Sequence, residues 1–370
     1  KPRRMKIASF NINGIRARLP RLVEWLDREQ PDVVCLQELK CADESLPIGD
    51  IEAAGYGAVW HGQKGFNGVA ILARGTDGLT ATVAEVEARG RRALGISTDV
   101  SDHEGIEAAA SEIESTMGPI DLWVNNAMVG VFGEFLTTEP KDFERGLAVN
   151  YLGFVNGTRA ALKRMVPRGY GHVIQVGSAL AHRGIPLQAS YCGAKHAVLG
   201  FTESVTTELI HMGSPVAIST VDMPALNTIQ FNWVKSQLPH HPQPVAPIYE
   251  PEVGARAIAA VADKPRRRTW VGESTVATVL GNRFGAGFLD TFLAKTAYSG
   301  QQAPQKSEPM LPNNLYSPVA GDQGVRGIFS DEAHSVSPQV WYIRNRGLAR
   351  GVAAALVGVG AAVALSSRRR

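Results

Sequence analysis

The hydrophobic pattern of the first 75 residues alternates between strand and helix. Short apolar, β-rich runs at residues 6–12, 33–36 and 68–74 predict buried strands. Between the first two runs, apolar residues recur at helical spacing over residues 19–29. Strands interleaved with helix in this way predict an α/β arrangement.

From Thr76 onward the alternation becomes regular. Strands are predicted at residues 93–98, 120–124, 172–177 and 216–221, and helices at residues 79–89, 103–117, 140–166 and 191–211. Repeated β-α units of this length predict a parallel sheet with helices on both faces.

The pattern is lost near the C-terminus. Residues 301–339 are rich in Pro, Ser, Asn, Gln and Gly without a period, which predicts a linker or a disordered segment. Residues 351–365 are apolar and are followed by three arginines at 368–370. A membrane span needs about 20 residues, so this tail predicts at most weak membrane contact.

Composition and charge exclude few classes of protein. Hydrophobic residues make up 44% of the chain and charged residues 20%, which is typical of a globular protein. The net charge of +3 is too small to indicate nucleic acid as a partner. Three cysteines with neither metal-ligand spacing nor an even disulfide set favour a reducing, cytoplasmic setting, with membrane association through residues 351–365 as the alternative.

One group of residues indicates a catalytic function. Ser178 follows a predicted strand, and Tyr191 and Lys195 lie on the predicted helix after it. The Tyr–Lys spacing of four places both side chains on one helix face. A nearby ammonium should lower the pKa of the phenol toward neutrality, so that Tyr191 can exchange a proton with a carbonyl or alcohol oxygen. Ser178 lies at the carboxyl end of a strand, where open α/β sheets bind ligands.

With these residues the sequence from about 72 to 300 resembles the short-chain dehydrogenase/reductase family. The resemblance implies a Rossmann-type doubly wound sheet and an NADP-dependent oxidoreductase acting on an alcohol/carbonyl pair. It implies that Ser178, Tyr191, Lys195 and Asn150 are catalytic, with Lys195 also bonding the nicotinamide ribose and Asn150 holding a relay water. Further cofactor contacts are implied at Arg74, Asp99, Val100, Asn126, Ala127, Pro224 and Thr228.

Several of these positions have alternatives. Asp99 could instead be a helix N-cap, Asn126 could bridge neighbouring strands, and Arg74 could be a surface arginine. Arg74 is the basis for NADP, because a basic residue ending the second strand can pair with a 2′-phosphate. Two positions depart from the family pattern: Met128 and Met223 stand where glycines are usual.

The first β-α unit of the Rossmann-type fold is missing. The family's Thr-Gly-x-x-x-Gly-x-Gly turn, which holds the pyrophosphate at a helix N-terminus, does not occur before Arg74. Gly62, Gly65 and Gly68 precede a strand instead of following one, which is the wrong context for a phosphate-binding turn. Binding of the cofactor should therefore be impaired.

Residues 5–75 stand where the first β-α unit of the dehydrogenase would be. They resemble the N-terminus of exonuclease III, a metal-dependent DNA-repair nuclease. The matching runs are KIASFNINGIRARLPRLVEWL, PDVVCLQELK and AAGYGAVWHGQKGFNGVAILAR. The resemblance implies Asn11 and Glu38 as vestigial Mg²⁺ ligands. The nuclease family's later active-site residues are absent, and Ser101-Asp102-His103 is interpreted as a helix start.

We therefore expect a chimera joined near Leu72-Ala73-Arg74-Gly75. The predicted parts are residues 1–74, an α/β exonuclease III-like fragment; 75–300, the dehydrogenase domain; 301–346, a linker; and 347–370, an apolar tail with a basic end. A truncated nuclease and a noncatalytic fusion product are the alternative functions. A small-molecule alcohol or carbonyl is the expected partner, and a homo-oligomer remains open.

Overall fold

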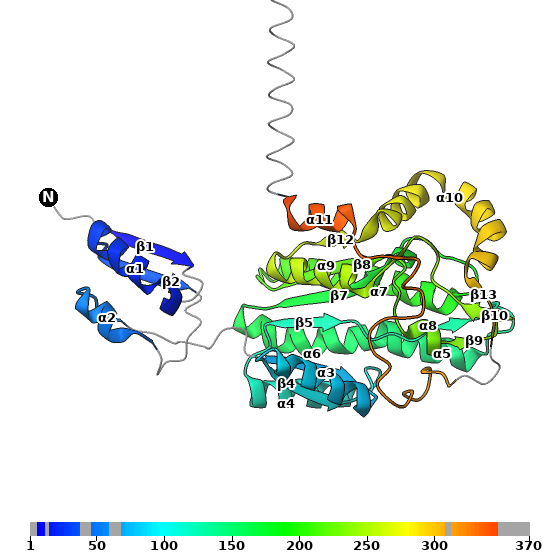
Figure 1. Ribbon diagram of the computed structural model, residues 1–370, viewed down its shortest axis with the longest axis horizontal. Coiled ribbons are helices and arrows are strands. Elements are labelled where there is room, and N and C mark those ends of the chain that lie inside the picture. Colours follow the sequence, from blue (N-terminus) through cyan, green and yellow to red (C-terminus); the bar gives the residue numbers. More distant parts are fainter. Residues whose placement is uncertain (1–5, 12–14, 38–45, 59–67, 308–311, 347–370) are drawn as a thin grey trace, which may run out of the picture. The chain divides into compact units, whose positions relative to one another are not determined.

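The computed structural model describes residues 6–11, 15–37, 46–58, 68–307 and 312–346 (Figure 1). The chain divides into two compact units: residues 1–69 with 85–94, and residues 70–84 with 95–370. Glu38 and the apolar tail at 351–365 lie outside the described residues. Within the described ranges, none of the helices is both long and apolar enough to cross a membrane.

Unit 1 contains a small parallel β-α-β arrangement. Strand β1 (Ile7–Asn11) pairs in parallel with β2 (Val33–Gln37), and α1 (Ile15–Glu29) connects them. With the short helix α2 (Ile48–Ala53), this arrangement packs around a core of Ile15, Leu22, Leu26, Leu46 and Ile51. The predicted strands and helix are present, and α1 begins four residues earlier than the apolar spacing indicated.

Unit 2 is built on a four-stranded parallel sheet with the order β12-β8-β7-β5. These strands are β5 (Leu122–Asn125), β7 (His172–Ser178), β8 (Ala217–Met223) and β12 (Arg268–Trp270). All seven residues of β7 are buried, as expected for a central strand covered on both faces. The α/β fold with parallel strands predicted from the sequence is confirmed.

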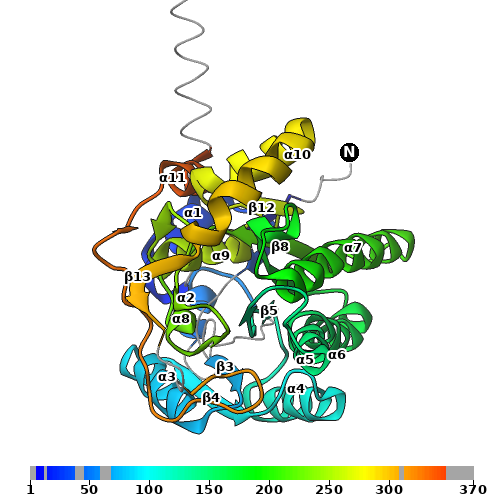
Figure 2. The same cartoon turned by 90° about the vertical axis from the view of Figure 1, so that its right-hand side faces the viewer.

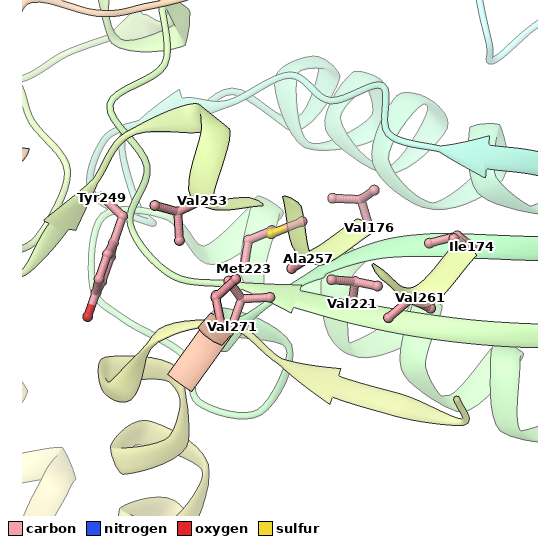
Figure 3. Packing of buried hydrophobic residues seen from close by; sticks show 10 residues of the cluster. Ile174, Val176, Val221, Met223, Tyr249, Val253, Ala257, Val261 and Val271 are labelled. Carbon is pink, nitrogen blue, oxygen red and sulfur yellow. The ribbon is translucent and has the colours of Figure 1, made fainter. Parts of the chain in front are cut away.

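Helices complete the unit, and the first of them continues into residues 85–88 of unit 1 (Figures 1 and 2). They are α3 (Thr76–Ala88), α4 (His103–Met117), α5 (Pro140–Leu147), α6 (Gly153–Arg168), α7 (Ala189–His211), α8 (Gln230–Trp233), α9 (Pro251–Asp263), α10 (Gly272–Gly300) and α11 (Pro338–Arg344). On α9, Val253, Ala257 and Val261 recur every four residues, so they share one face. Figure 3 shows this face against Ile174 and Val221 of the sheet, in the core of the unit.

The parallel sheet is interrupted beyond β5. Strands β3 (Gly68–Ala73) and β4 (Arg92–Ser97) form a separate two-stranded sheet, and β5 ends the four-stranded order. Among the described residues no strand pairs with the second edge of β5. Leu122 and Val124, on one face of β5, are 39% and 38% exposed. This interruption lies where the sequence lacks a first β-α unit.

The helix predicted over residues 140–166 is two α-helices joined by a short π-helix. Helix α5 leads into the π-helix η2 (Ala148–Leu152), and α6 follows directly. Asn150 lies in η2, where its amide bonds to the backbone of Val129 instead of facing solvent. A π-type turn inside a helix is common at functional sites.

The described residues between 301 and 346 differ from the linker that their composition predicts. Short strands pair with earlier segments: β13 (Gln302–Lys306) with β10 (His240–Pro242), and β14 (Ala333–His334) with β11 (Ile248–Tyr249). A further pair joins β6 (Val131–Phe132) to β9 (Lys235–Ser236). Residues 312–330, here called the strap, are anchored by buried Leu315 and Phe329 (Figures 1 and 2, orange to red-brown). These packed side chains give the segment a fixed place despite its polar composition.

Candidate active site

Ser178 ends the central strand β7 and begins a one-turn 3-10 helix, η3 (Ala179–Ala181). Its hydroxyl accepts a hydrogen bond from the Leu180 N–H at 3.1 Å and caps that turn. The side chain is buried, and it hydrogen-bonds to Tyr191. The end of the strand and the cap together fix the Ser178 hydroxyl in position.

Tyr191 and Lys195 lie one turn apart on α7, as their spacing predicts. The Lys195 ammonium is 4.4 Å from the centroid of the Phe154 ring and 5.7 Å from that of the Tyr191 ring. It also donates a 2.9 Å hydrogen bond to the Val176 carbonyl of β7. The structure thus brings Ser178, Tyr191 and Lys195 together at the carboxyl end of β7.

The electrostatics of this group differ from the expected lowering of the Tyr191 pKa. Burial raises the pKa of the Tyr191 phenol to about 12, although the hydrogen bond with Ser178 opposes the rise. Burial also lowers the pKa of the Lys195 ammonium to about 7, against the nearby Asp222 carboxylate. Both shifts have one cause, because burial penalises the charged form of each group.

Asn150 holds the segment that follows β5. Its amide donates to the Val129 carbonyl at 2.8 Å and accepts from the Val129 N–H at 2.9 Å. The side chain is 1% exposed, so these two bonds satisfy a buried polar group. Asn150 therefore ties η2 to the chain that runs on from Asn125, Asn126 and Ala127.

The strand-bridging role considered for Asn126 belongs to its neighbour. Asn125 is buried, and its amide nitrogen donates to Gln175 of β7 at 2.8 Å and to Thr158 of α6 at 3.0 Å. Its oxygen accepts from the Trp123 indole at 2.8 Å. Asn126 follows the last residue of β5 and is exposed. The bridging interpretation of Asn126 is therefore replaced by one for Asn125.

A buried acid–base pair lies beside the predicted set and was missed from the sequence. Asp222 of β8 is fully buried, and its Oδ2 atom is 2.9 Å from Nε2 of His182. Its Oδ1 atom has no hydrogen-bond partner in the described part of the chain. No spacing signal connects these residues, because β8 and the turn after η3 become neighbours only in the folded sheet.

A second polar group gathers where β3 and β4 end. Asp99 forms an ion pair with Arg145 of α5, and Arg74 lies 3.9 Å from the same carboxylate. Burial alone would raise the pKa of Asp99, but hydrogen bonds from Ser101 and Arg145 lower it. The alternative of Asp99 as helix cap is wrong, because Asp102 caps α4 by accepting from the Glu104 N–H. That cap confirms the helix start at Ser101-Asp102-His103.

The strap covers this group. Leu315 is 0% exposed and packs against Val129, Val131 and Val149, with Val100 at the margin of the cluster. Its carbonyl accepts hydrogen bonds from Nε of Arg145 at 2.9 Å and from Nη1 of Arg74 at 3.5 Å. Arg74 also donates to the Asn314 carbonyl. Arg74 is thus a half-buried partner of the strap and not a surface arginine.

The strap also reaches the loop after β8. Pro224 is buried beside Gly272, and Thr228 forms an isolated antiparallel bridge with Arg326 of the strap. The neighbouring Asn227 accepts a 3.0 Å hydrogen bond from the Phe329 N–H. The strap therefore contacts two residues that were predicted to bind the cofactor, Arg74 at one end of the site and Thr228 at the other.

The predicted vestigial metal ligands fall outside what the structure describes. Asn11 ends β1, but its side chain is not described, and Glu38 lies in an undescribed range. In the ranges that are described, no cluster of three or more His, Cys, Asp or Glu side chains could hold a metal ion.

The parallel sheet and the Ser178–Tyr191–Lys195 group at its carboxyl edge define an α/β oxidoreductase. Residues 58–237 match the family model of short chain dehydrogenases, and residues 8–76 match that of the Endonuclease/Exonuclease/phosphatase family. The uncharacterized oxidoreductase YxnA of Bacillus subtilis is 30% identical over 80% of this chain and 85% of its own length. The chain belongs to the short-chain dehydrogenase family.

Further relatives agree with this assignment. The putative oxidoreductase SadH of Mycobacterium tuberculosis is 29% identical over 58% of this chain and 80% of its own length. The structure of a short-chain dehydrogenase from Streptomyces avermitilis superposes with a TM-score of 0.51 at 21% identity, over 80% of this chain and 98% of that one. The two family matches overlap over residues 58–76, a range that includes the predicted join near residues 72–75.

The residues present do not fit a whole nicotinamide dinucleotide. The carboxyl end of β7 offers the Ser178 hydroxyl hydrogen-bonded to the Tyr191 phenol, with the Lys195 ammonium near the Tyr191 ring. At the other end, Leu315 fills the apolar space beside Val100, and strap carbonyls accept hydrogen bonds from Arg74 and from Nε of Arg145. The sequence before Arg74 also lacks the Thr-Gly-x-x-x-Gly-x-Gly run that holds a pyrophosphate at a helix N-terminus.

Proposed function

We propose that this chain is an oxidoreductase for an alcohol/carbonyl pair, with NADP(H) as its cofactor and with its cofactor affinity impaired. The observation that carries the proposal is the convergence of Ser178, Tyr191 and Lys195 at the carboxyl end of β7. Family membership supports the reaction class. The choice of NADP(H) rests on Arg74 and Arg145, two guanidinium groups at the ends of β3 and α5.

In the proposed mechanism the three side chains act on the substrate oxygen. The Ser178 hydroxyl donates a hydrogen bond to that oxygen, and the Tyr191 phenol exchanges a proton with it. A phenol with a raised pKa holds its proton at neutral pH, which suits a proton donor in carbonyl reduction. Lys195 supports Tyr191 from the next turn of α7, and Asn150 keeps the segment after β5 in place.

The contacts to the pyrophosphate that this chain lacks should lower its affinity for the cofactor. Backbone N–H groups at a glycine-rich helix N-terminus normally supply much of the binding of a pyrophosphate. The sequence before Arg74 lacks the glycine-rich run Thr-Gly-x-x-x-Gly-x-Gly that forms such a turn. We therefore propose weak binding of NADP(H), weaker than micromolar, with turnover observable only at high cofactor concentration.

The test uses the full chain, millimolar NADPH and a panel of aldehydes and ketones, with cofactor oxidation followed by absorbance. Tyr191→Phe removes the proton donor and should lower the rate by at least about a hundredfold. Tyr298→Phe is the matched control, because Tyr298 lies exposed on α10 and should leave the rate unchanged. A near-normal rate in Tyr191→Phe would overturn the assignment of the proton donor.

A further inference from the structure

The strap makes contacts that are specific to the region where a nucleotide would lie. It contacts Arg74 after β3 and Asp77 of α3 at one side, and Thr228 in the loop after β8 at the other. In open α/β sheets, ligands bind outside the carboxyl ends of the strands. Leu315 therefore lies where the fold places a ligand, and its 0% exposure shows that it fills that position closely.

We propose that the strap is an intramolecular competitor of the cofactor, in which Leu315 and the carbonyls of Asn314 and Leu315 occupy the adenosine half of the site. This inference rests on the proposed function, since it takes the cofactor class from there. A nucleotide binds only to molecules whose strap has been released. The strap and the missing glycine-rich turn are thus two separate causes of weak cofactor binding.

The chemistry of the contacts supports exchange of the strap for a nucleotide. Arg74 and Arg145 donate to neutral backbone carbonyls of the strap, and both also lie beside the Asp99 carboxylate. A phosphate is a stronger partner for a guanidinium group, because both partners are charged and can form paired hydrogen bonds. The slot that holds Leu315 is lined by valines, which suit a flat heteroaromatic ring as well as an aliphatic side chain.

The strap is held at its ends and exposed between them. Leu315 and Phe329 are buried, whereas Val325 and Ile328 are 59% and 54% exposed. Near the middle, the Gly321 N–H donates a 2.7 Å hydrogen bond to Asp77. Release of the end at Leu315 therefore breaks the hydrogen bonds from Arg74 and Arg145, the Asn314–Trp233 backbone bond and the Tyr316–Asp142 bond, while the Phe329 end stays attached.

The decisive experiment measures binding of adenosine 2′,5′-bisphosphate and of NADPH by titration calorimetry, without any readout of turnover. Leu315→Ala removes the side chain that fills the slot and raises the fraction of molecules with an open strap. Both ligands should bind at least about tenfold more tightly than to the unmodified chain. Val325→Ala, an exposed position on the same strap, is the control and should bind as the unmodified chain does.

Hydrogen exchange on the unmodified chain gives a second reading that does not depend on the variant folding. Saturating adenosine 2′,5′-bisphosphate should accelerate exchange of the amides at residues 313–316. Equal affinities of all three proteins, or unchanged exchange at these amides, would overturn the proposal. Absence of binding to every protein at millimolar ligand would overturn it as well. Loss of activity in Tyr191→Phe bears only on the chemistry, so the two proposals fail separately.

Discussion

At the scale of single residues, burial of Lys195 lowers the free energy of unfolding by an amount that depends on pH. Burial lowers its pKa from 10.5 to about 7, so between these values the unfolded chain binds more protons than the folded one. Stability should therefore rise as pH increases through this window, by up to about 1.4 kcal/mol per pH unit. Burial raises the pKa of Cys192 above 9.0 and that of Tyr191 to about 12, so their opposite effects begin at higher pH.

Urea unfolding at pH 7.5 and 8.5 measures this contribution. The unmodified chain should be more stable at the higher pH, and Lys195→Met should lose most of that difference because it has no proton to release. Lys163→Met is the control, since Lys163 is 47% exposed and paired with Glu107. If stability depended on pH equally in Lys195→Met and in the unmodified chain, the lowered pKa of Lys195 would be refuted.

The sequence predicted the residues whose partners lie nearby in the chain or at fixed positions in a strand–helix unit. Tyr191 and Lys195 contact each other because they are one helical turn apart, and Ser178 follows from the end of β7. Asp222 and Arg145 could not be predicted in the same way. Their partners come from other strands or helices, and no periodicity links such positions.

At the scale of elements, β5 shows the consequence of the interrupted sheet. Its residues alternate between buried and exposed, and Leu122 and Val124 form the exposed face. An exposed apolar strand at a sheet edge favours association with other chains. Leu122→Thr combined with Val124→Thr should reduce this association, because threonine keeps β propensity while adding a polar group.

Analytical ultracentrifugation and thermal unfolding would check this prediction. The double variant should sediment as a smaller species, with stability changed by no more than about 0.5 kcal/mol per site. Val173→Thr is the matched control on β7, where the side chain is fully buried and an added hydroxyl should lower stability. Unchanged association of the double variant would show that this face of β5 is not the cause.

Element positions were largely predictable where hydrophobic periodicity is strong. Helix α4 has the predicted bounds, and β7 differs by one residue. The π-helix η2 was not predictable, because it leaves no mark on the hydrophobic period, and the partner of Asn150 within it, Val129, lies in another segment. The strap was missed for a related reason: its anchors, Leu315 and Phe329, are single buried residues in a polar segment and form no period.

At the scale of the whole molecule, the N-terminal fragment should have no nuclease activity. The Endonuclease/Exonuclease/phosphatase match covers residues 8–76 only, and Asn11 and Glu38 are the two metal ligands that the resemblance implies. Two oxygen ligands leave Mg²⁺ largely hydrated, whereas phosphodiester hydrolysis needs a positioned metal and an activated water. Purified protein should leave duplex DNA intact in millimolar Mg²⁺. Digestion that disappears in Glu38→Ala would contradict this.

The contacts of the strap can form only late in the synthesis of residues 1–330. Arg74 and Leu315 are 241 positions apart in the chain, so their hydrogen bond cannot form until residue 315 has been synthesised. Until then, Arg145 and the valines around Leu315 have no strap to cover them. Apolar surface left open during synthesis is what chaperones bind. A nascent chain of this protein should therefore depend on chaperones until residue 315 has left the exit tunnel.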